Sequence, residues 1–191
     1  MFLVFSSCPR TCTTFLINCT NYIITNYGIT KKIEQLSDAS HYFHYKHCSD
    51  KHFIIKMETF IQTHHNIIPK EEKLVIHSSR DYKNSIDSLN RLSLDNNRKH
   101  QTMTENILQE YDEFCKKEAD ILFEYKNIRE NKKKEIERLV AFFKEKQMIE
   151  KDMEIHISEI INHSTTRGTT TTSRRVLNRG GRFPNMSCWL N

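Results

Sequence analysis

The sequence predicts a mostly α protein built on one long, coiled-coil-like helix of about 60 residues, with shorter helices before it and disordered ends. Three observations predict this fold class. Residues 102–161 contain no Pro and no Gly and repeat apolar residues at steps of three and four. The whole chain has only 4 Gly and 3 Pro, whereas sheet folds need many tight turns. A mean hydropathy of −0.65 with 28% charged residues also favours an extended helix over a large core.

Charge is distributed unevenly along the chain. The net charge of +5 combines +4 in residues 1–100, −4 in residues 101–162 and +5 in residues 163–191. The last segment contains five arginines and no acidic residue. Such asymmetry is typical of proteins that bind a partner through a charged tail.

Residues 1–52 are expected to form a poorly ordered arm that contains Cys, His and Tyr. Short strands at 13–17 and 21–25 are the alternative, because these segments are rich in β-branched residues. The apolar run Phe2–Phe5 is too short for an ordinary secretory signal, and no segment approaches the length of a membrane-spanning helix. We therefore expect an intracellular protein, nuclear or cytoplasmic, without membrane contact; a poor secretory signal is the alternative.

A His-rich segment follows within this arm. His44, Cys48 and His52 would share one face of a helix, and imidazole and thiolate are good zinc ligands. Cys8 and Cys12 could supply a second ligand pair, but nothing between the pairs resembles a zinc finger. We therefore expect a solvated His/Tyr-rich linker, with a zinc site as the alternative, and the sequence predicts no other cofactor.

Residues 53–98 are expected to form short helices. Apolar spacing predicts one helix that starts at Phe53 and ends before Pro69, and another over residues 80–94. Between them, Leu74–Ile76 fits either a helix interior or a short strand, and the sequence does not distinguish these.

The long helix is predicted over residues 102–162. Thr102 and Glu105 match the capping box S/T-x-x-E, which satisfies two backbone N–H groups at a helix start. An apolar seam then runs along the helix and is the predicted interaction surface. It consists of Ile107, Tyr111, Phe114, Ile121, Tyr125, Ile128, Ile136, Leu139, Phe143, Ile149, Met153, Ile157 and Ile160.

This seam is irregular. Charged residues interrupt it at Glu118, Lys132 and Lys146, and the step from Tyr125 to Ile136 is eleven residues long. These features favour an irregular bundle over a two-stranded zipper. A rod of roughly 90 Å would expose the seam, so we expect it to meet a second copy, residues 53–95, or a helical protein partner.

Residues 163–191 are predicted to be a disordered basic tail rich in Thr and Arg. Arg174, Arg175, Arg179 and Arg182 could contact phosphate, which makes nucleic acid a second candidate partner.

The sequence contains none of the common catalytic signatures, such as a P-loop, G-x-G-x-x-G, G-x-S-x-G or H-E-x-x-H. It therefore predicts a non-enzymatic oligomerisation or scaffold protein that acts through residues 102–161. The alternative is a chromosomal or ribonucleoprotein-associated coiled-coil protein that uses its arginine tail.

Overall fold

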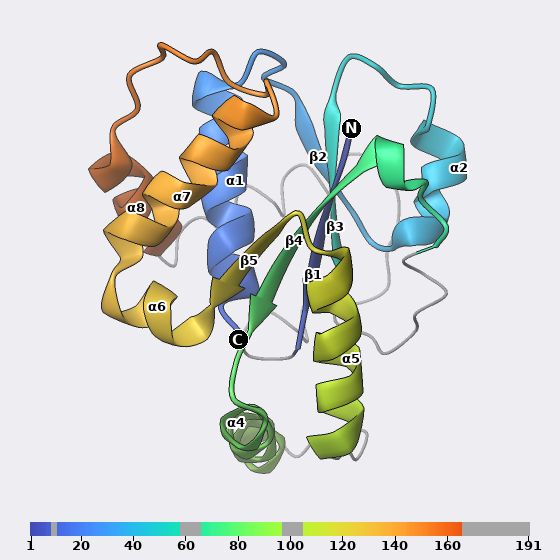
Figure 1. Ribbon diagram of the computed structural model, residues 1–191, viewed down its shortest axis with the longest axis vertical. Coiled ribbons are helices and arrows are strands. Elements are labelled where there is room, and N and C mark those ends of the chain that lie inside the picture. Colours follow the sequence, from blue (N-terminus) through green and yellow to red (C-terminus); the bar gives the residue numbers. More distant parts are fainter. Residues whose placement is uncertain (9–10, 58–65, 97–104, 166–191) are drawn as a thin grey trace.

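Five parallel strands form the centre of the protein in a computed structural model that describes residues 1–8, 11–57, 66–96 and 105–165. The strand order is β2-β3-β1-β4-β5, so the first strand of the chain lies in the middle of the sheet (Figure 1). The prediction of a mostly α protein with one long helix is therefore wrong. The strands are β1 (Phe2–Ser7), β2 (Ile33–Leu36), β3 (His52–Met57), β4 (Lys73–Ser79) and β5 (Ile121–Glu124).

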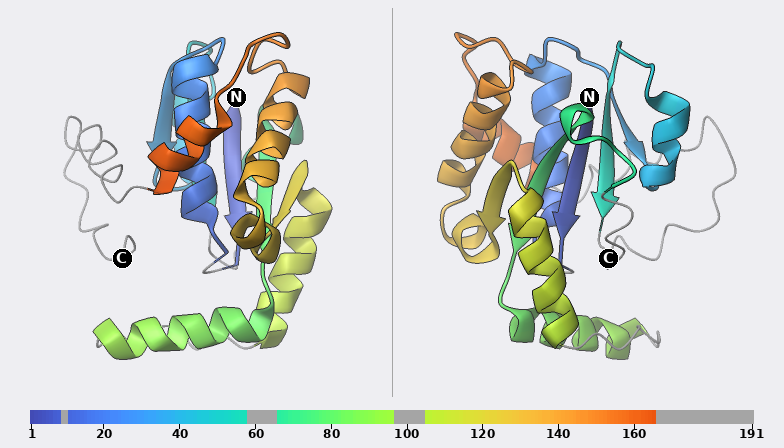
Figure 2. Two further views of the ribbon diagram at one scale, coloured as in Figure 1. Left: turned by 90° about the vertical axis from the view of Figure 1, so that its left-hand side faces the viewer. Right: turned by 45° about the vertical axis from the view of Figure 1, so that its right-hand side comes forward.

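Helices cover both faces of this sheet, as parallel sheets require. The α-helices are α1 (Thr13–Tyr27), α2 (Tyr42–Tyr45), α4 (Tyr82–Asn96), α5 (Glu105–Glu118), α6 (Tyr125–Glu130), α7 (Lys132–Glu145) and α8 (Ile157–Thr165), and short 3₁₀ turns are η1 (Ala39–His41) and η2 (Lys70–Glu72). Helices α1, α7 and α8 lie together on one side of the sheet, with α2 and α5 on the other (Figure 1). Helix α4 contacts α5 and extends away from the sheet (Figure 2).

Strand β1 corrects the prediction of a poorly ordered arm. All six of its residues are buried, and it pairs with β3 on one side and β4 on the other. Alternate side chains serve opposite faces: Leu3 and Phe5 join the core under α1, while Phe2 and Val4 join the core under α2. A short, continuous apolar run is typical of a parallel strand buried on both faces.

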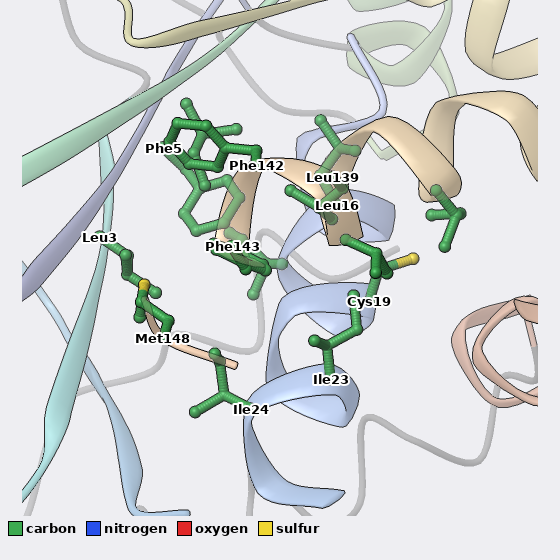
Figure 3. Close-up of a cluster of buried hydrophobic side chains, with 14 of the residues drawn as sticks. Leu3, Phe5, Leu16, Cys19, Ile23, Ile24, Leu139, Phe142, Phe143 and Met148 are labelled. Carbon is green, nitrogen blue, oxygen red and sulfur yellow. The ribbon is translucent and has the colours of Figure 1, made fainter. Parts of the chain in front are cut away.

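The larger core lies between the sheet and helices α1 and α7. Figure 3 shows Phe5 of β1 close to Phe143 of α7, Leu3 of β1 close to Met148, and Leu16 on the side of α1 that faces this cluster. Phe5, Leu16 and Phe143 are each 0% exposed. Burying apolar surface at roughly 25 cal/mol per Å² makes this layer a main source of stability.

Helix α1 replaces the two short strands that residues 13–25 could have formed. Its buried positions include Leu16, Cys19, Ile23 and Ile24, which recur at steps of one, three and four on one helix face. Packing on the sheet therefore overrides the strand preference of its β-branched residues. The helix ends at Gly28, where an added Cβ would lie 2.5 Å from the Ile24 carbonyl oxygen.

The predicted 60-residue helix is interrupted in three places. After α5, the Asp120 N–H donates to the Val75 carbonyl (2.9 Å) and strand β5 pairs with β4. At the second break Asn131 separates α6 from α7, and its side chain accepts from the Lys134 N–H. The third break follows the end of α7 at Glu145, and Gln147 two residues later has a φ of 55°. Thr102 of the predicted capping box lies outside the described residues.

The earlier segments also differ from the prediction of short helices. Residues 52–57 are strand β3, and Leu74–Ile76, which the sequence left open, lie in strand β4. The predicted helix over 80–94 is present as α4. In the described parts of the chain, no helix has both the length and the apolar character to cross a membrane.

Candidate functional site

The candidate site lies at the carboxyl ends of β1 and β4. These strands are neighbours, yet the chain leaves β1 through α1 toward β2 and leaves β4 through α4 in the other direction. In open parallel sheets such a reversal of direction creates a crevice where ligands bind. Two polar clusters occupy this edge, one on each face of the sheet.

The connection from β1 to α1 is built as a strand, a short loop and a helix. It has the length of a P-loop, but Ser7 and Cys12 stand where that motif has glycines and Thr13 stands in place of its lysine. Cys12 precedes α1 with φ 66°, the left-handed region that glycine favours. The side chain of Cys12 makes no capping hydrogen bond to this helix, whose first N–H groups have no partner within the helix itself.

Four hydroxyl groups form what we call the hydroxyl cluster: Ser7, Thr11, Thr13 and Ser78. Thr11 Oγ1 lies 2.8 Å from Ser78 Oγ and 3.1 Å from Thr13 Oγ1, and Thr13 donates to Ser7 Oγ at 2.6 Å. All four side chains are almost completely buried. Ser7 and Ser78 follow the alternation of the α1 face, so this cluster lies beside the start of α1.

The opposite face carries the charged cluster: His77, Tyr82, Asp112 and Lys116. Asp112 Oδ1 lies 2.8 Å from His77 Nε2. Its Oδ2 accepts hydrogen bonds from Lys116 Nζ (2.6 Å) and from the Tyr82 hydroxyl (3.2 Å). His77 is 0% exposed and Asp112 is 1% exposed. One carboxylate therefore joins β4, α4 and α5.

These contacts change the acidity of the groups around Asp112. Burial pushes the pKa of Asp112 upward, but hydrogen bonds from His77 and Lys116 outweigh it and hold the pKa below its usual value. Burial, followed by the negative charge of Asp112, raises the pKa of Tyr82 to about 12. The same two causes raise the pKa of the Cys8 thiol far above its usual range. Asp112 therefore stays ionised, while Tyr82 and Cys8 keep their protons.

An open pocket of about 700 Å³ adjoins the charged cluster. It lies between the start of α4, the end of α5 and the connection from β5 into α6. Arg80 lies over the ring of Tyr125, with 4.1 Å between the guanidinium carbon and the ring centroid. Cations, carboxylates and two aromatic rings share the wall: Ser79, Arg80, Asp81, Tyr82, Asn84, Asp112, Lys116, Glu124, Tyr125, Lys126, Arg129 and Glu130.

Comparison with known proteins finds a similarity of fold. No family model matches the sequence, and no curated protein matches it. Among solved structures, the chain is similar to mouse sulfotransferase SULT7A1 complexed with PAP, with a TM-score of 0.56 and 16% sequence identity. The match covers 96% of this chain and 69% of that one. The fold is sulfotransferase-like.

This finding corrects the predicted function as well as the predicted fold. A non-enzymatic coiled-coil scaffold required a long helix with an exposed seam, and the chain instead has a parallel α/β fold similar to that of a sulfotransferase. At 16% identity the likeness concerns the fold. The chemistry must therefore be argued from the chain's own residues.

The predicted seam residues are distributed over separate elements. Ile121 lies in β5, Tyr125 and Ile128 lie in α6, and Ile107 is 41% exposed on α5. All of the others lie in the core or pack against it: Tyr111, Phe114, Ile136, Leu139, Phe143, Ile149, Met153, Ile157 and Ile160. Their periodicity reflects contacts within one chain, and Tyr125 also lines the pocket.

The predicted zinc residues do not share a helix face. His44 lies in α2, Cys48 follows that helix, and His52 begins β3. Across the described residues, no group of three His, Cys, Asp or Glu side chains is placed to hold a metal ion.

The tail predictions concern residues that the structure does not describe. Arg174, Arg175, Arg179 and Arg182 lie outside the described residues. Nucleic acid, a second copy and a helical protein remain predicted partners, and nuclear or cytoplasmic localisation remains a prediction.

Sequence reasoning missed both polar clusters for a physical reason. The hydroxyl cluster has no glycine-rich signature, because Cys12 adopts the left-handed conformation itself. His77 and Asp112 are 35 residues apart, and only the fold brings them together. One signal was present: the apolar run Phe2–Phe5, followed by a short polar loop and Thr13-Thr14 at the start of a helix.

Proposed function

We propose that this chain is a sulfotransferase that binds PAP and its sulfated form at the carboxyl edge of the sheet. The observation that carries the proposal is the pocket beside Arg80 and Tyr125, in a fold similar to a sulfotransferase solved with PAP. PAP is an adenosine with a phosphate on each of two ribose hydroxyls. It needs cations and N–H donors for its phosphates and an aromatic or apolar surface for its base.

The residues at this edge fit such a nucleotide. Arg80 offers a planar set of donors suited to phosphate, and the ring of Tyr125 offers a face on which a base can stack. On the other face of the sheet, the start of α1 offers backbone N–H groups, and its N-cap Cys12 makes no side-chain capping bond. The N-terminus of a helix favours phosphate through those groups and through its dipole.

Sulfuryl transfer requires little covalent chemistry from the protein. The bond from sulfur to the nucleotide phosphate oxygen breaks, and a bond forms from sulfur to a hydroxyl or amine of the acceptor. The acceptor gives its proton to water, and PAP leaves with the electrons of the broken sulfur–oxygen bond. Negative charge grows on the phosphate as it leaves, so fixed donors at the start of α1 would stabilise the transition state.

The hydroxyl cluster supports this role by shaping the loop. Thr11 donates to the Cys8 carbonyl (2.9 Å) and lies against Ser78, which ties the loop to β4. A loop fixed before the ligand arrives loses less conformational entropy on binding.

Calorimetric titration of the full chain with PAP tests the proposal. Arg80→Gln removes a pocket cation, and Lys83→Gln removes an exposed cation from the same helix start without touching the pocket wall. We expect Arg80→Gln to weaken PAP binding about tenfold or more, since a hydrogen bond to a charged group contributes about 1.5–3 kcal/mol. Lys83→Gln should bind PAP as the unchanged chain does, and adenosine without phosphates should bind far more weakly.

Two results would contradict the proposal: an unchanged chain that does not bind PAP, or an Arg80→Gln variant that binds it equally well. Turnover is then measured as PAP released from its sulfated form, with the same two variants.

A further inference from the structure

The carboxylate of Asp112 connects the buried end of β4 to the pocket wall. Its Oδ1 faces His77, whose Nδ1 lies 2.9 Å from the Ser6 carbonyl oxygen. Its Oδ2 faces Tyr82 and Lys116, and both of these residues line the pocket. The inner oxygen is therefore held by the sheet, and the outer oxygen holds a cation at the pocket.

Lys116 is unusually constrained for a lysine at a surface. Its side chain is 40% exposed, yet Nζ lies 2.6 Å from a carboxylate that is 1% exposed. A free lysine side chain has about 2 kcal/mol of rotamer entropy to lose on binding, and the contact with Asp112 removes part of that loss beforehand. An ammonium group has three donors, so Lys116 can bind Asp112 and still donate to a ligand.

Stability alone is a weak reason for this arrangement. A buried ion pair is often no more stabilising than apolar residues of similar volume, because both charges lose their hydration. Here the buried carboxylate adjoins a pocket with further cations, Arg80, Lys126 and Arg129, and the pocket wall also carries the carboxylates of Asp81, Glu124 and Glu130. Ionised groups held by specific partners in a cleft mark functional sites.

We propose that Lys116 binds an anionic group of the pocket's ligand and that Asp112, anchored by His77, is the positioning residue that holds it there. The inference rests on the proposed function, in which the anionic group is a phosphate of PAP. Lys116 then distinguishes nucleotides that place a phosphate near α5 from nucleosides that do not.

Calorimetric titrations of the full chain with PAP and with inorganic pyrophosphate test this assignment. Lys116→Met removes the ammonium, Lys116→Arg keeps a cation, and Lys117→Met removes the adjacent exposed lysine, which does not line the pocket. We expect Lys116→Met to weaken PAP binding about tenfold, the effect of one charged hydrogen bond. Lys116→Arg should recover most of the affinity, and Lys117→Met should change it by less than about twofold.

A double-mutant cycle separates positioning from a general structural role. Asp112→Asn should weaken PAP binding when Lys116 is present and have little further effect in the K116M background, because Asp112 acts through Lys116. Equal effects of Asp112→Asn in both backgrounds would overturn the positioning role. If Asp112→Asn fails to fold, as thermal unfolding would reveal, the three lysine variants alone decide whether Lys116 binds the ligand.

The two probes distinguish the failure of this inference from the failure of the proposed function. If the unchanged chain binds PAP and Lys116→Met binds it equally well, the inference is wrong and the proposed function stands. If the chain binds pyrophosphate but not PAP, the proposed function is wrong, and loss of pyrophosphate binding in Lys116→Met supports the anion site. Binding of neither probe overturns both.

Discussion

The hydroxyl cluster and the charged cluster lie on opposite faces of the same strand ends. The first orders the loop before α1, and the second holds Lys116 at the pocket. Ser7, Thr11, Thr13 and Ser78 are neutral, and each hydroxyl can donate and accept. The charged cluster centres instead on one buried carboxylate, whose partners must all be present. Neutral hydroxyl groups can therefore order a loop at a small desolvation cost. Holding a cation at a pocket instead requires a buried charge together with its counter-charges.

Removing His77 should have the largest effect on stability. His77→Leu fills similar space but leaves Asp112 without its partner on the sheet side. Losing a hydrogen bond to a buried charged group costs about 1.5–3 kcal/mol, and we expect a loss near the upper end of that range in the free energy of unfolding by urea. A loss under about 1 kcal/mol would mean that the charged cluster contributes no more to the unfolding free energy than the hydroxyl cluster does.

The next difference should appear in acid. The pKa of Asp112 in the folded protein is below the ordinary value of 3.8. The ionised carboxylate therefore contributes its full stabilisation above pH 3.8. This stabilisation is lost as the pH falls through the folded pKa, because the unfolded chain binds the proton more readily. The stability difference between the unchanged chain and Asp112→Asn should therefore shrink below pH 3.8. Urea unfolding across pH 2–6 measures it, and Thr13→Val serves as a variant whose effect should not depend on pH. A constant Asp112 difference would contradict the assigned ionisation.

Removing one hydroxyl should have a moderate effect. Thr13→Val keeps the shape of the side chain but deletes the group that contacts Ser7 and Ser78. Its neighbours keep other partners, so we expect a loss of about 1 kcal/mol in unfolding free energy. A loss as large as that of His77→Leu would mean that the neighbouring hydroxyl groups do not find other hydrogen-bond partners.

The smallest expected effect is a gain. Cys12→Gly places glycine at φ 66°, which removes strain but increases the entropy of the unfolded chain. We expect a net stabilisation of about 0.5 kcal/mol, measured as a small rise in melting temperature. A destabilised variant would indicate that the Cys12 side chain contributes contacts that exceed the backbone strain.

The sequence predicted local elements better than it predicted the fold. The helix over residues 80–94 was readable because its apolar spacing is local, and α4 lies there. The 102–161 segment misled because the apolar residues of α5, α6, α7 and α8 continue nearly one periodicity. The break at Ile121 depends on pairing with Ile76, 45 residues earlier, and local spacing carries no record of such a contact.

The candidate site was less predictable still. Its residues come from the ends of β1 and β4, from α5 and from the β5–α6 connection, and the sequence contains no single motif for them. No sequence motif marks His77 and Asp112, and they come into contact only because the sheet and α5 bury them together. Only the strand, loop and helix at the N-terminus could have suggested a phosphate-binding connection.

Hydrogen–deuterium exchange with and without PAP tests the central claim most directly, because it reports where the ligand protects the backbone. We expect added protection at the start of α1, at residues 79–84 and at residues 124–130, with none at the opposite edge near Ile33 and His52. Protection confined to that opposite edge, or no protection under conditions where PAP binds, would contradict a nucleotide site at the carboxyl ends of the strands.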